Sequence, residues 1–330
     1  MPASPRRPMI PVLLVIAVLL VVHVMAAIVA TRVIAARIEE QNPPGGIFVP
    51  VAGGRLHLYD LGPAGTPVGL PILLIHGATS NARDMVFALG DALSRHHRVI
   101  AVDRPGHGWS SRPGGRADAS PARQARLIAE ALRRMDVGKV VVVGHSLAGA
   151  VAAGFALDHA DQTAGLVLLA PVTHPWPGGV TWYYGLAALP VIGDIFVDTV
   201  MTPIGAWNLE ASAAASFAPL AGPSDYASKT AAALVLRPAE FRWNAQDIAD
   251  LLPFVGKQAA RYGDIRVPTA ILASDDDTVV STTIHAEAIA RQIAGAGLTV
   301  LHGRGHQIHY TARDAVLAEI EHIAAAAAVR

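Results

Sequence analysis

The sequence predicts an α/β protein with a doubly wound, mostly parallel sheet, an inserted helical segment and one N-terminal membrane-spanning helix. Short runs of branched apolar residues alternate with helical stretches, as in a parallel sheet whose strands are joined by helices. An apolar run of 22 residues near the N-terminus predicts the spanning helix. The chain has 330 residues, of which 52% are hydrophobic and 16% charged, so it has the material for a large core.

The N-terminal run, residues 9–30, carries no charge. At 1.5 Å per residue it spans about 33 Å as a helix, against about 30 Å for a hydrocarbon core. Arg6 and Arg7 precede it and favour a cytoplasmic N-terminus, so we expect a single-pass membrane protein with an extracytoplasmic body. The alternative is a signal peptide that is cleaved near Ala30 and releases a secreted protein. The run is longer than a typical signal-peptide core, which favours an uncleaved anchor.

The rest of the chain divides into two parts of a sheet domain and an insertion. Residues 1–46 form the anchor and a linker, 47–171 the first part of the sheet domain, 172–262 a helical cap and 263–330 the second part. The cap is rich in proline and contains four of the five tryptophans. We expect strands at 55–61, as a half-exposed edge strand, and at 71–75, 99–102, 140–143, 166–169, 269–272 and 298–301. We expect helices at 82–94, 121–135, 147–158, 282–294 and 311–325.

A candidate nucleophile follows the predicted strand 140–143. Ser146 lies in the segment Gly144-His145-Ser146-Leu147-Ala148-Gly149, between a strand and a helix. A serine on such a tight turn exposes its hydroxyl above the sheet, and the small residues around it relieve crowding. The common pattern has glycine at the fifth position, where this chain has Ala148, which is still small.

Serine needs a base to take its proton and an acid to orient that base. Asp277 follows the predicted strand 269–272 and is our choice for the acid, with Asp275 and Asp276 as turn residues. His306 follows the last predicted strand and is our choice for the base, with His302 and His309 as alternatives. We expect the backbone N–H groups of Ala78 and Leu147 to form the oxyanion hole.

Several functions are excluded or disfavoured by composition. Basic and acidic residues balance at 26 each, and without a basic excess we expect no nucleic-acid partner. The chain has no cysteine, so thiol nucleophiles, disulfides and zinc–thiolate sites are excluded. The pair His306 and His309 has no carboxylate at ligand spacing, and we expect no metal.

Five segments, in this order, resemble the α/β-hydrolase superfamily, in particular its cap-bearing serine hydrolases that act on small molecules. They are HGATSNARDM, DRPGHGWSSRP, VVVVGHSLAGA, VPTAILASDDDTVV and GRGHQIHY. The resemblance implies an eight-stranded, mostly parallel sheet, a triad of Ser146, Asp277 and His306, and no cofactor. Dehalogenases and epoxide hydrolases of this superfamily have an aspartate nucleophile, so Ser146 argues against both activities.

The predicted function is therefore a serine hydrolase, esterase- or lipase-like, that cleaves carboxylic esters of small or lipophilic substrates. Three alternatives stay open: a carbon–carbon bond hydrolase of the ring-cleavage type, with Arg237 or Arg242 binding a substrate carboxylate; a perhydrolase (haloperoxidase); and a catalytically silent, membrane-tethered binding protein. The cap aromatics are expected either to line a pocket or to form the cap's own core. They are Trp176, Trp182, Tyr183, Tyr184, Phe196, Trp207 and Phe217.

Overall fold

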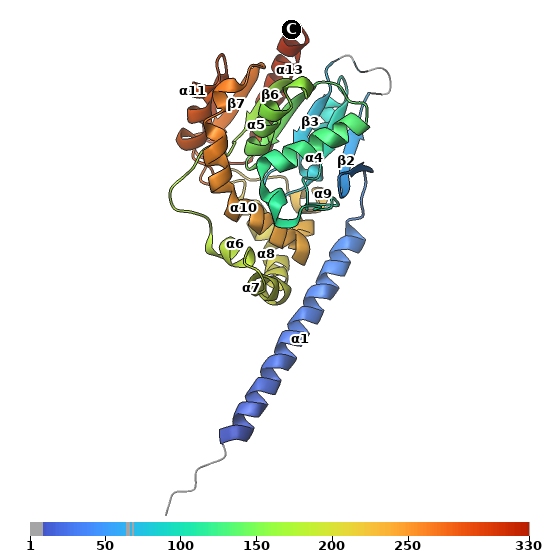
Figure 1. Cartoon of the computed structure of the whole chain (residues 1–330), viewed down its shortest axis with the longest axis vertical. Helices are drawn as coiled ribbons and strands as arrows, with labels where there is room; N and C mark the ends of the chain where they lie inside the picture. Colours follow the sequence, from blue (N-terminus) through green and yellow to red (C-terminus); the bar gives the residue numbers. More distant parts are fainter. Residues whose placement is uncertain (1–8, 64–66, 68, 330) are drawn as a thin grey trace, which may run out of the picture.

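The computed structural model describes residues 9–63, 67 and 69–329, and their side chains from residue 11 onward. Within these residues the sheet has eight strands in the order β1-β2-β4-β3-β5-β6-β7-β8, with helices on both faces (Figure 1). The six strands from β4 to β8 are parallel, and β1 and β2 are antiparallel. The strands are β1 (Ile47–Val51), β2 (Gly54–Leu61), β3 (Ile72–Ile75), β4 (Val99–Val102), β5 (Val140–His145), β6 (Thr163–Leu169), β7 (Thr269–Ser274) and β8 (Gly297–Leu301).

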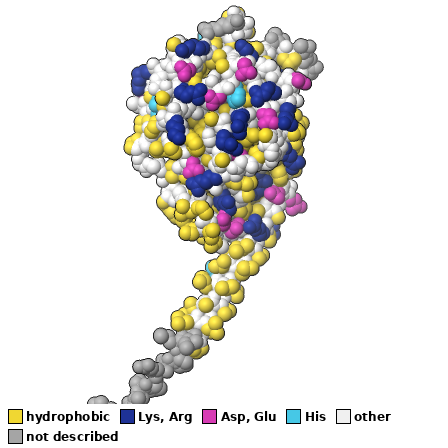
Figure 2. Space-filling view, in the orientation of Figure 1, with side chains coloured by type: hydrophobic (Ala, Val, Ile, Leu, Met, Phe, Trp, Pro, Cys, Tyr) yellow, Lys and Arg dark blue, Asp and Glu magenta, His cyan; other side chains and the backbone are white. Residues whose placement is uncertain are grey.

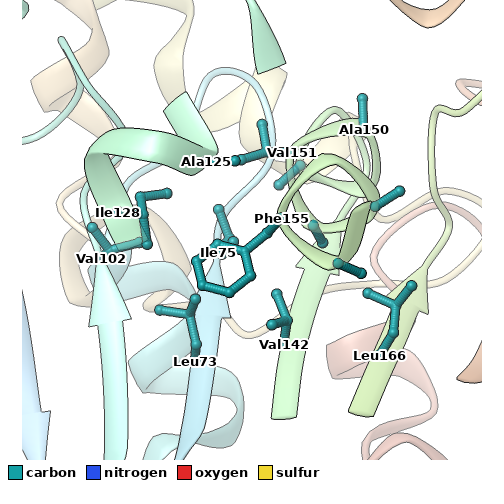
Figure 3. Packing of buried hydrophobic residues seen from close by; sticks show 14 of the residues in the cluster. Leu73, Ile75, Val102, Ala125, Ile128, Val142, Ala150, Val151, Phe155 and Leu166 are labelled. Atoms are coloured by element: carbon teal, nitrogen blue, oxygen red, sulfur yellow. The ribbon is translucent and has the colours of Figure 1, made fainter. Parts of the chain in front are cut away.

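The central strands confirm the pattern of continuous apolar runs. Every residue of β3, β4 and β5 is buried, because helices cover both faces of the sheet. On one face, Phe155 of α5 (Ala148–Asp158) packs over Leu73 and Val142, and Ile128 of α4 (Pro121–Arg134) lies beside it (Figure 3). The opposite face is covered by α2 (Ala82–Met85), η1 (Val86–Gly90), α3 (Asp91–Leu93) and α13 (Arg313–Ala328). The remaining elements of the sheet domain are η2 (Gly115–Ala119), η3 (Ala160–Gln162), η6 (Tyr262–Asp264), η7 (Thr283–Glu287), α11 (Ala288–Gln292) and α12 (Ile308–Thr311).

The prediction of a half-exposed edge strand at 55–61 was wrong. This segment is β2, which pairs with β1 on one side and β4 on the other, and Leu56, His57 and Leu58 are all buried. The edge is formed by β1, a five-residue strand with Pro50 in it, which the sequence pattern did not reveal. Proline is tolerated there because an edge strand needs hydrogen bonds on one side alone.

Residues 172–262, predicted as a cap, contain helices and connect β6 to β7. The longest helix, α10, has 22 residues and includes Pro253, although the sequence suggested short pieces alone. Figure 1 shows α6, α7 and α8 together at one end of the body. Helix α1 leaves the body beside this end. The elements are α6 (Trp182–Ala187), α7 (Ile192–Phe196), η4 (Val197–Met201), α8 (Thr202–Ala215), α9 (Tyr226–Lys229), η5 (Ala232–Leu236) and α10 (Pro238–Ala259). The division of the chain at residues 46, 171 and 262 stays a prediction.

Helix α1 (Met9–Gln41) extends 11 residues beyond the predicted apolar span. Between Val12 and Val29 all its large apolar side chains but Val24 and Ile28 are 52% to 64% exposed, and they form an apolar stem below the body (Figure 2). Thr31 and Ile38, in contrast, are buried against the body. By length and composition α1 can cross a membrane, and a signal sequence has the same properties.

Candidate active site

Ser146 lies on the sharp turn between β5 and α5. Its φ of 55° is in the left-handed region, which non-glycine residues rarely adopt. A Cβ on Gly144 would lie 2.5 Å from the carbonyl oxygen of Ala148, and a Cβ on Gly149 would lie 2.4 Å from Cβ of Pro171. The turn therefore requires both glycines, whereas the fifth position of the motif accepts Ala148.

The side chains of Ser146, His306 and Asp277 form a hydrogen-bonded line. His306 Nε2 lies 3.0 Å from Ser146 Oγ, and His306 Nδ1 lies 2.7 Å from Asp277 Oδ2. The other carboxylate oxygen of Asp277 accepts hydrogen bonds from the backbone N–H groups of Val279 and Val280, at 2.8 and 2.9 Å. Both oxygens of the carboxylate are thus engaged, which fixes its plane toward the imidazole.

The two alternative histidines pair with other carboxylates. His302 contacts Asp275 at the surface, where its side chain is 87% exposed. His309 is fully buried, with Nε2 3.5 Å from Asp84 Oδ2. Among the described residues, neither histidine forms a hydrogen bond to Ser146.

Ala78 and Leu147, whose backbone N–H groups were predicted as the oxyanion hole, line the same cavity as Ser146. Neither donates a hydrogen bond within the part of the chain that the structure describes. The turn that carries Ala78 is held by Thr79, whose φ is 56° and whose N–H donates to Asn244 Oδ1 at 2.7 Å. The role of the Ala78 and Leu147 amides as an oxyanion hole stays a prediction.

A buried ion pair, which the sequence analysis missed, supports this turn. The guanidinium of Arg104 donates to the carbonyl oxygens of His76 and Gly77, at 3.0 and 3.1 Å. It also pairs at 2.6 Å with Asp247 of α10, and Asp247 pairs with Arg112. Arg104 belongs to the segment DRPGHG, but no local pattern in the sequence indicates its partner 143 residues away. The pair ties α10 to the loop that presents Ala78.

His145, next to the candidate nucleophile, holds the loop that carries His306. Its Nε2 lies 3.2 Å from the carbonyl oxygen of His306. Burial, together with the neighbouring His309 and His306, lowers the pKa of His145 well below its ordinary value. The ring is therefore neutral at pH 7, and its Nε2–H donates to the carbonyl.

A cavity of about 820 Å³ lies over Ser146. Of the aromatic residues proposed for a pocket, Trp176, Tyr183 and Tyr184 line it. Phe196 packs within the inserted segment, and Phe217 is buried against Tyr226 and Tyr310. Trp207 does neither, because it is 87% exposed. Trp182 is 70% exposed, although its ring contacts those of Tyr183 and Phe196.

The charged residues of the cavity wall are acidic. Among the described residues that line it are the carboxylates of Asp84 and Asp277, but no lysine or arginine. Arg237 pairs with Glu240 and lies over the ring of Trp109, and Arg242 pairs with Asp194. Neither arginine lines the cavity.

Sequence and structure comparisons identify the family. The profile of the alpha/beta hydrolase family matches residues 72–320. The chain belongs to this family. Among curated relatives, this alpha/beta hydrolase is 33% identical over 142 residues to 2-hydroxymuconate semialdehyde hydrolase of Pseudomonas putida, covering 42% of this chain and 47% of the relative. The matched part of the chain covers between about a quarter and a half of the length of the curated relatives.

Solved structures share the fold of this alpha/beta hydrolase. A hydrolase from Pseudomonas aeruginosa PA01 superposes with a TM-score of 0.66 at 22% identity, over 86% of this chain and 99% of that structure. An esterase from Exiguobacterium antarcticum superposes with a TM-score of 0.64 at 20% identity, over 84% and 99%. At these identities the likeness concerns the fold alone.

Proposed function

We propose that this protein is a serine hydrolase that cleaves carboxylic esters of uncharged, apolar substrates. The observation that carries the proposal is the hydrogen-bonded line of Ser146, His306 and Asp277 at the cavity. Ala78 and Leu147, to whose backbone N–H groups the proposal assigns the oxyanion hole, line the same cavity. A nucleophile, its base and oxyanion donors in one cavity are the parts that acyl transfer needs.

In the proposed mechanism, Ser146 Oγ attacks the ester carbonyl carbon while His306 Nε2 takes the hydroxyl proton. The carbonyl oxygen becomes an oxyanion, which accepts hydrogen bonds from the N–H groups of Ala78 and Leu147. His306 then gives the proton to the leaving alkoxide, and the alcohol departs from an acyl-serine. Water, deprotonated by His306, attacks the acyl group and releases the acid. Asp277 orients the imidazole and stabilises its charged form.

The proposal assigns substrate selection to residues 172–262 as a cap. Trp176, Tyr183 and Tyr184 supply aromatic walls, and Leu209 and Val235 add aliphatic ones. Such walls favour the transfer of apolar groups from water. We propose that the cavity accepts a lipophilic acyl or alcohol group.

The proposal also assigns membrane anchoring to α1. Its 22 uncharged residues match the thickness of a hydrocarbon core, and most of its described apolar side chains are exposed. Orientation with the body outside the cytoplasm follows from the arginines that precede the span. Cleavage after the span, with a secreted body, is the alternative.

A carbon–carbon bond hydrolase is the second candidate, because the curated relative from Pseudomonas putida is named as a semialdehyde hydrolase. A muconate-type substrate carries a carboxylate, and a buried carboxylate needs a paired cation. The described cavity wall offers the carboxylate of Asp84 and no arginine or lysine. This charge pattern favours a neutral ester.

The first experiment compares the full chain in detergent with its Ser146→Ala variant on p-nitrophenyl esters of increasing acyl length. We expect hydrolysis by the wild type, with a preference for longer chains, and a loss on the order of 10⁶-fold in kcat in the variant. Labelling with a serine-directed phosphonate provides a second readout. Equal inactivity of both proteins on every ester, with labelling of Ser146, would favour carbon–carbon cleavage, and absence of labelling would favour a silent binding protein.

A peroxide-dependent halogenation assay tests the perhydrolase alternative.

A further inference from the structure

The junction of α1 with the body defines where a bilayer surface would lie. From residue 11 to residue 30, α1 has 20 residues, or about 30 Å of helix, which is the thickness of a hydrocarbon core. The next residue, Thr31, is buried on the body. Arg32 then donates hydrogen bonds to both carboxylate oxygens of Asp198, at 3.2 and 3.3 Å. Asp198 belongs to η4, so this turn lies at the level where α1 leaves the body.

The helices on either side of η4 expose large apolar side chains that the protein core does not use. Figure 2 shows apolar surface at the end of the body that adjoins the apolar stem of α1. Exposed fractions range from 54% for Ile204 to 87% for Trp207. We name this surface the apolar cap face, and it consists of Trp182, Val191, Ile192, Ile195, Ile204 and Trp207.

The charged groups within this stretch are paired. Asp194, between Ile192 and Ile195, forms an ion pair with Arg242, and Asp198 pairs with Arg32. Pairing lowers the free-energy cost of bringing charge close to a low-dielectric medium. Beyond Trp207, α8 continues with exposed Asn208 and Glu210, which end the apolar face.

We propose that the apolar cap face docks onto the lipid bilayer that α1 crosses. This inference rests on the membrane insertion of α1 proposed above, and it adds a second contact made by the folded body. Tryptophan favours the boundary between headgroups and acyl chains, and Trp182 and Trp207 provide two such side chains next to the stem. The face is too apolar to be an ordinary exposed surface, and α1 brings a bilayer directly to it.

The same helices also wall the cavity. Leu209 and Ser212 of α8 and Tyr183 of α6 line the space over Ser146, while Trp207 and Trp182 of these helices point to solvent. Docking of the face would therefore bring the cavity wall to the lipid surface. The substrate class that fits this arrangement is an ester dissolved in the bilayer.

The test uses the absence of cysteine from the chain, which allows a single label on the full-length protein. Three variants, Trp207→Cys, Leu19→Cys and Val329→Cys, are labelled with the fluorophore NBD and reconstituted into phosphatidylcholine vesicles. Leu19 reports insertion of α1. Val329 is 86% exposed at the C-terminal end of the body, away from the stem (Figure 1). Fluorescence is compared with and without doxyl-labelled lipid, which quenches NBD within the membrane.

We expect the label at position 207 to emit at shorter wavelength than the label at 329 and to be quenched at least twofold more by doxyl lipid. Quenching at 19 with none at 207 would overturn the docking inference while leaving the anchor in place. Absence of quenching at 19 would overturn the anchor and the inference together. A blue-shifted label at 207 without quenching would show that a second copy of the chain, rather than lipid, covers the face.

Discussion

Two carboxylate–imidazole pairs lie at the carboxyl ends of β7 and β8, and their surroundings separate their roles. Asp277 and His306 are shielded from solvent, and His306 continues the hydrogen-bonded line to Ser146. Asp275 and His302 form a surface pair, which contributes little because water screens it. Position relative to the serine, rather than residue type, distinguishes the pairs.

Replacing Asp277 by asparagine tests this distinction. An amide at this position keeps the shape but removes the charge that stabilises the imidazolium and the acceptor that selects the tautomer of His306. We expect kcat for ester hydrolysis to fall on the order of 10⁴-fold, with little change in KM. The matched control is Asp275→Asn, which should leave both constants within about twofold because that residue contacts exposed His302 and the backbone N–H of Gly303, and not the candidate triad. Equal losses in the two variants would contradict the assignment.

The sequence allowed the choice of Ser146, Asp277 and His306 because each follows a strand at the same edge of the sheet. Their catalytic roles stay a prediction. The contacts that support the site could not be predicted from the sequence. Arg104 and Asp247 are 143 positions apart, and their pairing depends on how α10 packs. Side chains that act through another residue leave no local pattern.

At the scale of elements, η7 is connected to the segment after β6 through His285. Its Nδ1 accepts hydrogen bonds from the backbone N–H groups of Thr173 and His174, both at 3.2 Å. An accepting Nδ1 cannot carry a proton. Burial and the nearby His174 accordingly lower the pKa of His285 to about 4.

This contact predicts acid sensitivity. In the unfolded chain His285 binds a proton near its ordinary pKa of about 6.5. In the folded chain it binds the proton only near pH 4. Its contribution to stability is therefore present above pH 6.5 and is lost as the pH falls toward 4. In His285→Asn the amide Oδ1 stands where Nδ1 does and can accept the same hydrogen bonds without titrating. We expect the thermal midpoint of the wild type, followed by circular dichroism in detergent, to fall more steeply from pH 6.5 to 4 than that of the variant. Parallel curves would contradict this explanation, since every other histidine is common to both proteins.

Elements were predictable where burial imposed a pattern. The strands β3 to β8 are apolar runs that end in turn residues, and all of them were expected. The short edge strand β1 was missed because it has few residues and contains Pro50. No helix was predicted at α10, which continues through Pro253 because packing of its buried face stabilises it.

At the scale of the whole molecule, the stem and the apolar cap face share one end of the protein, and the cavity lies behind that face. Sequence composition predicted the stem, since an uncharged run is visible without a fold. Composition could not separate the roles of the aromatic residues of the cap, because the direction in which each side chain points depends on how the short helices pack. Thus Trp176 lines the cavity and Trp207 points to solvent, although both were expected to serve one purpose.

If docking of the apolar cap face brings the cavity to lipid, loss of docking should lower the hydrolysis of substrates dissolved in the bilayer and leave that of water-soluble substrates unchanged. The double variant Ile195→Ser/Trp207→Ser removes apolar side chains from the face and touches neither the cavity wall nor the candidate triad. Each side chain that no longer transfers into lipid costs at least about 1.5 kcal/mol, or about 3 kcal/mol for the two together, so we expect hydrolysis of a long-chain ester in the same vesicles to fall on the order of 100-fold. Hydrolysis of a short, water-soluble ester should stay unchanged, and Val329→Ser should match the wild type on both substrates. An equal loss on both esters would mean that the variant disturbs the fold or the site, and an unchanged rate on the bilayer ester would mean that substrate reaches Ser146 without help from this face.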